Sequence, residues 1–281
     1  NTNLAAYYGR QGDFDKVREI SERWATISPQ HPAPQAFLAI IAERSGHLAE
    51  AMRLRRKVME MAPDDPRASR ELHFAELGLG EYHLALEADQ EFIRYRAMVL
   101  MGRKQDALAL VSQELAARPD FPLQQSDYLW VCHVTGEWPE IVRYYDATWG
   151  DAEAFEHSFN SPPYGLVLPA LADAGHKDAP AIFSAARDDL QTIRASGFQA
   201  AGYDVVDARI SMLEGDQDKA MDLLELAYDK GSRDIYLFID PVLNAASSPR
   251  FEALLAKTAD AINAERAKLG LPAIEMPEPY L

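Results

Sequence analysis

The chain has 281 residues, of which 48% are apolar, so it can bury a large core rather than stay disordered. Its formal charge of −16 disfavours binding of DNA, RNA or an anionic membrane surface, because phosphate neutralisation needs clustered Lys and Arg. No apolar run approaches the roughly 20 residues that cross a bilayer, and the single cysteine, Cys132, excludes an intrachain disulfide.

Glycines recur at a fixed interval in the first half of the chain. An interval of 34 residues separates Gly12 from Gly46, Gly46 from Gly80, and Gly102 from Gly136. Glycine tolerates the positive φ of a sharp turn just past a helix. A repeat of this length predicts an all-α solenoid of helix-turn-helix hairpins, each stacked on neighbours that bury its apolar face.

Prolines mark the other end of each hairpin. Pro29, Pro63 and Pro119 each follow one of these glycines by 17 residues, the length of one helix with its turn. Proline cannot continue a helix, and an Asp or Ser beside it can cap the next one. Helices that alternate with Gly and Pro stops are therefore predicted for a regular solenoid over residues 1–149.

These hairpins resemble the tetratricopeptide repeat family. The segment from Ala5 to Asp15 has the form of the family's first helix and Gly-acid-aromatic turn, and similar turns follow at Gly46, Gly80 and Gly136. The resemblance covers most of the chain, and it implies a right-handed superhelix of hairpins.

The repeat interval fails once, between Gly80 and Gly102, which are only 22 residues apart. No Gly or Pro lies between Glu81 and Met101, so this shortened unit is either two short helices that meet near Asp89 or one continuous helix. A continuous helix would be about 30 Å long. It would also make the later units present the opposite face.

Residues 150–163 are predicted to form a loop or kink between the regular solenoid and the degenerate hairpins of residues 164–281. The adjacent Pro162 and Pro163 cannot lie inside a helix. Apolar periodicity resumes from Leu166, and further turns are expected at Gly175 and Gly215.

The last third of the chain resembles a narrower group, the repeat regions fused to bacterial winged-helix regulators and adenylate cyclases. The turn Asp240-Pro241 and the helix start Pro249-Arg250-Phe251 carry this resemblance. A long polar helix from Pro249 to Leu269 is predicted to cap the solenoid by covering its last apolar face. Glu265 and Arg266 suit a solvent-facing end of that helix.

The sequence offers little catalytic chemistry. It has no phosphate-binding glycine loop, nucleophile elbow, paired-His motif or cysteine pair of metal-ligand spacing. Cys132 and His133 are adjacent, but neighbouring helical residues point about 100° apart and cannot pair as nucleophile and base. Acid pairs such as Asp188-Asp189 or Asp204 and Asp207 are interpreted as a solvated face. We therefore predict no enzymatic activity, no metal site and no cofactor.

The family resemblance implies that the first helix of each hairpin lines a concave groove. Carried over position by position, the groove comprises Phe37, Ile40, Arg44, Arg67, Arg70, Phe74, Trp130 and His133. This apolar and aromatic lining suits a partner protein or peptide with an apolar segment. Two alternatives stay open: Ile40, Phe74 and Trp130 could pack between hairpins as core, and Arg70 could pair with Glu71 or Glu76.

The predicted function is a protein-interaction scaffold, the sensory or regulatory arm of a bacterial signalling protein, which binds a partner or itself. The alternative is a small-molecule sensor with a pocket at residues 81–101 or 151–163, closed by Tyr144, Tyr145, Trp149 and Phe155. Since the chain begins at Asn1 within a repeat helix, a fragment of a longer protein is expected. Its compartment is predicted to be cytoplasmic, or periplasmic if a membrane segment precedes residue 1.

Overall fold

A computed structural model describes residues 2–10, 13–197, 200–245 and 248–280. Every regular element in these ranges is helical, and no β-strand occurs among them. The elements are α1 (Thr2–Arg10), α2 (Phe14–Ile27), α3 (Pro32–Arg44), α4 (Leu48–Met61), α5 (Pro66–Gly78), α6 (Tyr82–Ala85), α7 (Glu91–Leu100), α8 (Lys104–Ala117), α9 (Pro122–Val134), α10 (Trp138–Thr148), α11 (Ala152–His157), α12 (Tyr164–Asp173), α13 (Ala179–Ala195), α14 (Ala201–Leu213), α15 (Gln217–Asp229), the 3-10 helix η1 (Ile235–Ile239), α16 (Pro241–Ala245) and α17 (Pro249–Ala267).

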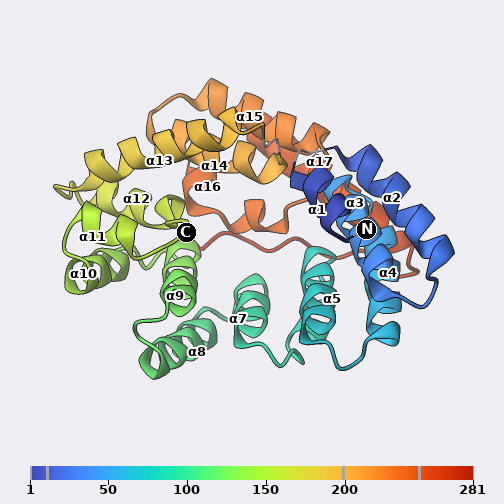
Figure 1. Ribbon diagram of the computed structural model, residues 1–281. Helices are drawn as coiled ribbons and strands as arrows, with labels where there is room; N and C mark the ends of the chain where they lie inside the picture. Colours follow the sequence, from blue (N-terminus) through green and yellow to red (C-terminus); the bar gives the residue numbers. More distant parts are fainter. Residues whose placement is uncertain (1, 11–12, 198–199, 246–247, 281) are drawn as a thin grey trace.

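Neighbouring helices pack as hairpins that stack along the chain. The helices of each pair α1/α2, α3/α4, α7/α8 and α14/α15 contact each other, and α2, α4 and α8 contact the helix that follows. Figure 1 shows the hairpins along a curve, with α4, α5, α7 and α9 on its lower side and α13, α14 and α15 on its upper side. The predicted all-α solenoid of hairpins is confirmed.

Glycine at positive φ follows the first helix of the regular hairpins. Gly46, Gly80, Gly102 and Gly136 have φ between 74° and 76°, a left-handed conformation that other residues adopt only with strain. The spacing of these glycines therefore reflects a backbone requirement repeated from hairpin to hairpin. Gly12, the first glycine of the predicted series, lies outside the described residues.

The shortened unit at 81–101 consists of two helices. α6 is a single turn that ends at Ala85, and α7 begins at Glu91 after residues 86–90 break the helix. The first predicted option is therefore correct. Since the missing residues all come from the second helix of this hairpin, α7 remains a first helix and pairs with α8 in the ordinary way.

The segment 150–163 is only partly a loop. It contains the six-residue helix α11, whose start is capped by the Asp151 carboxylate accepting from the Ala154 amide at 2.8 Å. The double proline lies in the non-helical residues that follow, as predicted. α12 packs directly on α9 and α10, so the hairpin stack continues across this segment.

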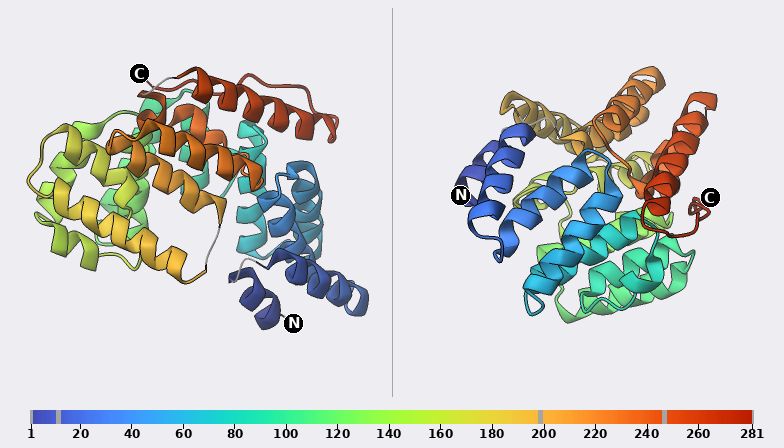
Figure 2. Two further views of the ribbon diagram at one scale, coloured as in Figure 1. Left: turned by 90° about the horizontal axis from the view of Figure 1, so that it is seen from above. Right: turned by 90° about the vertical axis from the view of Figure 1, so that its right-hand side faces the viewer.

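The C-terminal third returns to the first half of the chain. α17 contacts α15, as a cap would, but it also contacts α4 and η1. One hydrophobic core cluster contains Leu48 and Ile93 from the first half of the chain together with Phe238 and Ile262 from the last third. Figures 1 and 2 show η1 and α16 within the curve, and the segment after α17 running back beside that helix. The solenoid is thus closed on itself.

Candidate protein-binding surface

The predicted groove residues of α3 do not form an open surface. Phe37 packs into the N-terminal core beside Ile41, and Ile40 is half-buried. Arg44 is exposed, with its guanidinium carbon 5.1 Å from the centre of the Phe14 ring. Only Arg44 of this group is free to meet a partner.

The predicted residues of α5 are exposed or half-buried. Arg67 has a side chain that is 78% exposed and pairs with the helix cap Asp65. Arg70 is bound to Glu71 at 2.9 Å, which is one of the predicted pairings. Phe74 lies against the ring of Phe92 on α7, with 5.7 Å between ring centres. Arg67, Arg70 and Phe74 therefore form a stripe along α5, which we call the α5 stripe.

The predicted residues of α9 are covered by the chain itself. The Tyr236 ring of η1 stands edge-on to Trp130 at 5.5 Å, and the Arg96 guanidinium lies 4.6 Å from the Trp130 ring. His133 is only 2% exposed. The prediction that Trp130 and His133 line an open groove is therefore wrong, because the returning C-terminal third occupies this face of α9. Trp130 is partly buried and packs against the core cluster that contains Val99 and Val131.

Ionic and hydroxyl groups lie in the interface between α7, α9 and η1. Arg96 donates to Asp127 at 3.4 Å and to the Tyr95 hydroxyl at 3.3 Å. Burial raises the pKa of Asp127 above its usual range, although Arg96 opposes the shift. Burial also raises the pKa of Tyr236 to about 12. Burial is the main cause of both shifts, because it disfavours the charged form of a carboxyl or phenol group.

Cys132 and His133 do not form a reactive pair. Burial raises the pKa of the Cys132 thiol to about 12, and a protonated thiol is a poor nucleophile. Burial lowers the pKa of His133 to about 4, although the nearby Asp240 carboxylate opposes the shift. Asp240 itself pairs with Arg209 and accepts from the Val242 amide at 3.0 Å, so it is committed to the start of α16.

The end of α17 is a buried docking site, contrary to the predicted solvent-facing helix end. Glu265 is 6% exposed, and its carboxylate accepts from the Ala49 amide at 2.9 Å in the first turn of α4. Arg266 is 2% exposed, donates to the Leu79 carbonyl at the end of α5 and pairs with Glu81 at 2.7 Å. The polar sequence at the end of α17 predicted exposure to solvent, but the Glu265 and Arg266 side chains bind groups from the first half of the chain instead.

The segment after α17 is extended and crosses the ends of three first helices. We call residues 271–280 the tail. Ile274 lies directly over Gly80, at the end of α5. The Tyr280 hydroxyl donates to the Val99 carbonyl at the end of α7, and the Tyr280 carbonyl approaches Gly136 after α9. The tail thus lies against two of the repeated glycine turns, at Gly80 and Gly136, while a side-chain carbon at Gly102 would have no neighbouring atom within 4 Å.

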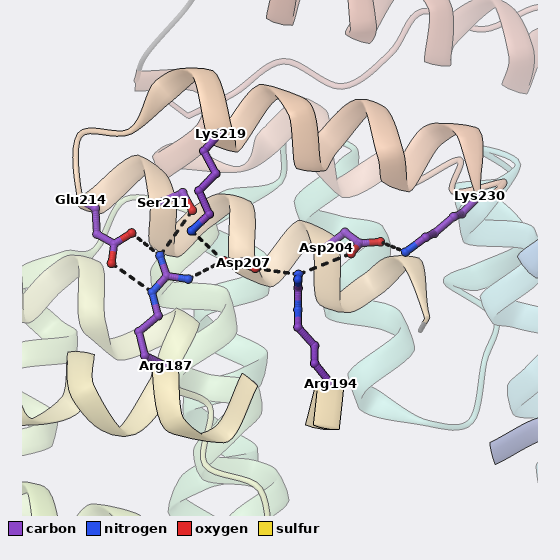
Figure 3. A network of polar contacts seen from close by, with 8 residues as sticks. All are labelled: Arg187, Arg194, Asp204, Asp207, Ser211, Glu214, Lys219 and Lys230. Carbon is purple, nitrogen blue, oxygen red and sulfur yellow. Dashed lines mark hydrogen bonds and ion pairs between the residues drawn. The ribbon is translucent and has the colours of Figure 1, made fainter. Parts of the chain in front are cut away.

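The acid pair Asp204 and Asp207 is buried within an ionic network whose basic side chains are partly exposed, rather than on a solvated face. Both residues are 5% exposed and lie on α14 between α13 and α15. Figure 3 shows the carboxylates among basic side chains. Asp207 pairs with Arg194 at 2.6 Å, with Lys219 at 3.8 Å and with Arg187, which also pairs with Glu214. Asp204 pairs with Lys230 at 2.7 Å and with Arg194 at 3.6 Å.

The aromatic residues proposed to close a sensor pocket fill the space themselves. Tyr145 and Phe155 are fully buried with ring centres 5.7 Å apart, and Trp149 contacts both rings. Of two shallow clefts, one is lined by Met221 and Leu243, and the other lies at the predicted position in 81–101, lined by Phe92, Tyr95 and Asp127. Their empty volumes are about 240 and 270 Å³ with the space open to solvent included, less than the roughly 300–1,000 Å³ that is usual for small-molecule sites.

The described ranges contain no cluster of three or more His, Cys, Asp or Glu side chains able to hold a metal ion. Nor is any helix in those ranges both long and apolar enough to cross a membrane. No known family model matches the sequence, and no curated protein is significantly similar to it.

Proposed function

We propose that this chain is a protein-interaction scaffold that binds an extended segment of a partner. The observation that carries the proposal is the tail, an extended segment seated across the ends of α5, α7 and α9. It is held by the Ile274 side chain at Gly80 and by a hydrogen bond from the Tyr280 hydroxyl to the Val99 carbonyl, which also accepts from the Gly102 amide. These are the means by which extended peptides are recognised.

The α5 stripe supports a second contact area. Arg67 is exposed and Arg70 is half-buried, like Phe74 beside them. Arg and aromatic residues are over-represented among those that contribute most to binding energy at protein interfaces. An exposed ion pair contributes little stability, so both arginines can exchange their present partners for acidic groups of a bound protein.

The proposed context is regulation within a bacterial signalling protein. Its support is the resemblance of Asp240-Pro241 and Pro249-Arg250-Phe251 to the repeat regions fused to winged-helix regulators and adenylate cyclases. The coding sequence upstream of Asn1 tests this part. A winged-helix or cyclase domain is the expected finding, and an unrelated effector domain would overturn it.

The scaffold proposal is tested with a partner captured by crosslinking from the source organism and then purified. Arg67→Glu with Arg70→Glu is expected to raise the dissociation constant of that partner at least tenfold. The control is Arg118→Glu with Arg143→Glu, which makes the same charge change in exposed pairs of α8 and α10. Equal affinity of both double variants for every purified partner would remove the α5 stripe from the proposal.

A further inference from the structure

The tail is composed for binding in an extended form. Pro272, Pro277 and Pro279 fix φ along it. A segment that is already extended loses less conformational entropy when it docks. Ile274, Met276 and Tyr280 are partly buried, while Glu275 and Glu278 are exposed. One side of the tail therefore faces the protein and the other faces solvent.

The surface beneath the tail is apolar, apart from the Val99 carbonyl that accepts from the Tyr280 hydroxyl. Met276 and Tyr280 pack against the core cluster that contains Leu79 and Val99. At Gly80, a side-chain carbon would lie 2.0 Å from the Ile274 Cδ1 atom. The glycine required for the turn thus also leaves the space that an aliphatic side chain fills.

The root of the tail, residues 272–274, is hydrogen-bonded to α17, and Ile274 also contacts the end of α5. Asn263 donates to the Ile274 carbonyl at 3.2 Å and accepts from the Ile274 amide at 2.9 Å. Arg266 donates to the Pro272 carbonyl at 2.7 Å. Tyr280, by contrast, bonds to α7. Residues 275–280 can leave the helix ends without breaking the bonds to α17, whereas moving Ile274 away from Gly80 also breaks its bonds to Asn263.

We propose that the tail is a resident ligand of the helix ends at Gly80, Val99 and Gly136, held in place until a partner segment of the same chemistry displaces it. The inference rests on the proposed function and names its partner class. That partner is an extended, proline-spaced protein segment with an aliphatic side chain for Gly80 and a tyrosine six residues later for the Val99 carbonyl. When such a segment displaces the tail, it covers the same apolar helix ends, so these are not left exposed to solvent.

The test uses the full chain and a labelled peptide with the sequence of residues 270–281. The variant Ile274→Glu with Tyr280→Ala weakens the tail's own docking. It is expected to bind the peptide at least about tenfold more tightly than the wild-type chain, in which the tethered tail competes at an effective concentration near millimolar. Fluorescence anisotropy gives both dissociation constants, and circular dichroism verifies that each chain is folded.

Matched glycine substitutions locate the peptide. Gly80 and Gly102 both have φ of 75°, but only Gly80 lies against the tail, so alanine strains both turns alike. In the tail-weakened chain, Gly80→Ala is expected to weaken peptide binding about tenfold, and Gly102→Ala to leave it unchanged. A peptide with Ile and Tyr exchanged for Glu and Ala should not bind.

A folded tail-weakened chain that binds the peptide no better than the wild type would overturn the inference, as would equal losses from both alanines. If Ile274→Glu prevents folding, Tyr280→Phe alone, which removes only the hydroxyl, must raise peptide affinity. These outcomes are separable from the scaffold proposal. Loss of the captured partner by the α5 variants would still support a scaffold when the tail proves to be a fixed part of the fold.

Discussion

At the scale of single residues, Asp207 has the most demanding environment in the ionic network. Its carboxylate is 7% exposed and meets Arg187, Arg194 and Lys219. Arg187 and Arg194 keep Glu214 and Asp204 as partners, and Arg194 and Lys219 are partly exposed, so the loss is that of charged hydrogen bonds rather than of a fully buried pair. We therefore expect Asp207→Asn to lower the free energy of unfolding by about 2 kcal/mol, measured by urea denaturation. Asp188→Asn, at an exposed position of α13, should change it by less than about 0.5 kcal/mol.

His133 makes stability depend on pH. Its pKa is about 4 in the folded protein, below the ordinary value of 6.5, because burial disfavours the charged ring. Between these two values the unfolded chain binds more protons, so the free energy of unfolding decreases as pH falls from 6.5 towards 4. The full loss is up to about 3 kcal/mol. Urea titrations at pH 7 and pH 5 should show a smaller difference for His133→Gln than for the wild type. Identical differences would contradict a buried neutral imidazole.

At the scale of elements, the start of α4 depends on a residue from α17. His47, the cap residue of α4, makes no side-chain cap hydrogen bond, and Glu265 accepts from the Ala49 amide instead. Loss of a cap costs about 1 kcal/mol. Glu265→Ala should therefore speed hydrogen exchange at the Ala49 amide and lower the melting temperature. Asp260→Ala, at an exposed site of the same helix, should leave Ala49 protected; equal effects would show that the bond is not stabilising.

The turns after α3 and α15 touch backbone to backbone. A side-chain carbon at Gly231 would lie 2.4 Å from the Arg44 carbonyl oxygen, so alanine cannot fit without moving the backbone. Gly215 also has positive φ but no atom within 4 Å of that position. We expect Gly231→Ala to cost about 1–3 kcal/mol more than Gly215→Ala, compared by thermal denaturation. Equal costs would mean that φ strain alone matters at both glycines.

Helix ends were predictable because their signals are local, whereas docking partners were not. Gly46 and Pro63 act within one turn of the backbone, so their spacing determines where helices stop. No such residue lies within 81–101, which left the break before α7 open. The burial of Glu265 depends on a residue 216 positions away, which composition cannot reveal.

The ionic network did leave a signal in the sequence. Arg187 and Arg194 are seven residues apart, two turns of one helix, and so lie on the same face of α13. Asp204 and Asp207 are three apart on the next helix, α14. Complementary charges on consecutive helices predict an interface rather than a solvated face. Asp204 and Asp207 without the two arginines of α13 do not indicate this interface.

At the scale of the whole molecule, closure couples the first hairpins to the last. An open solenoid has contacts only between neighbouring units, so parts of it can unfold separately. Here Arg266 bonds to the end of α5 and to Glu81, and Gly231 touches the turn before α4. Amides of α3 and α14 should therefore lose protection at the same urea concentration in the wild type.

Breaking the closing contact should separate the two halves. Arg266→Met keeps the packed stem but removes the charge that satisfies the Leu79 carbonyl and Glu81. We expect α3 and α4 to unfold at a lower urea concentration than α14 and α15 in this variant, measured by hydrogen exchange. Lys257→Met, at an exposed site of α17, should keep one common transition. A single transition in Arg266→Met would show that apolar packing of the C-terminal third is enough to make the closed solenoid unfold cooperatively.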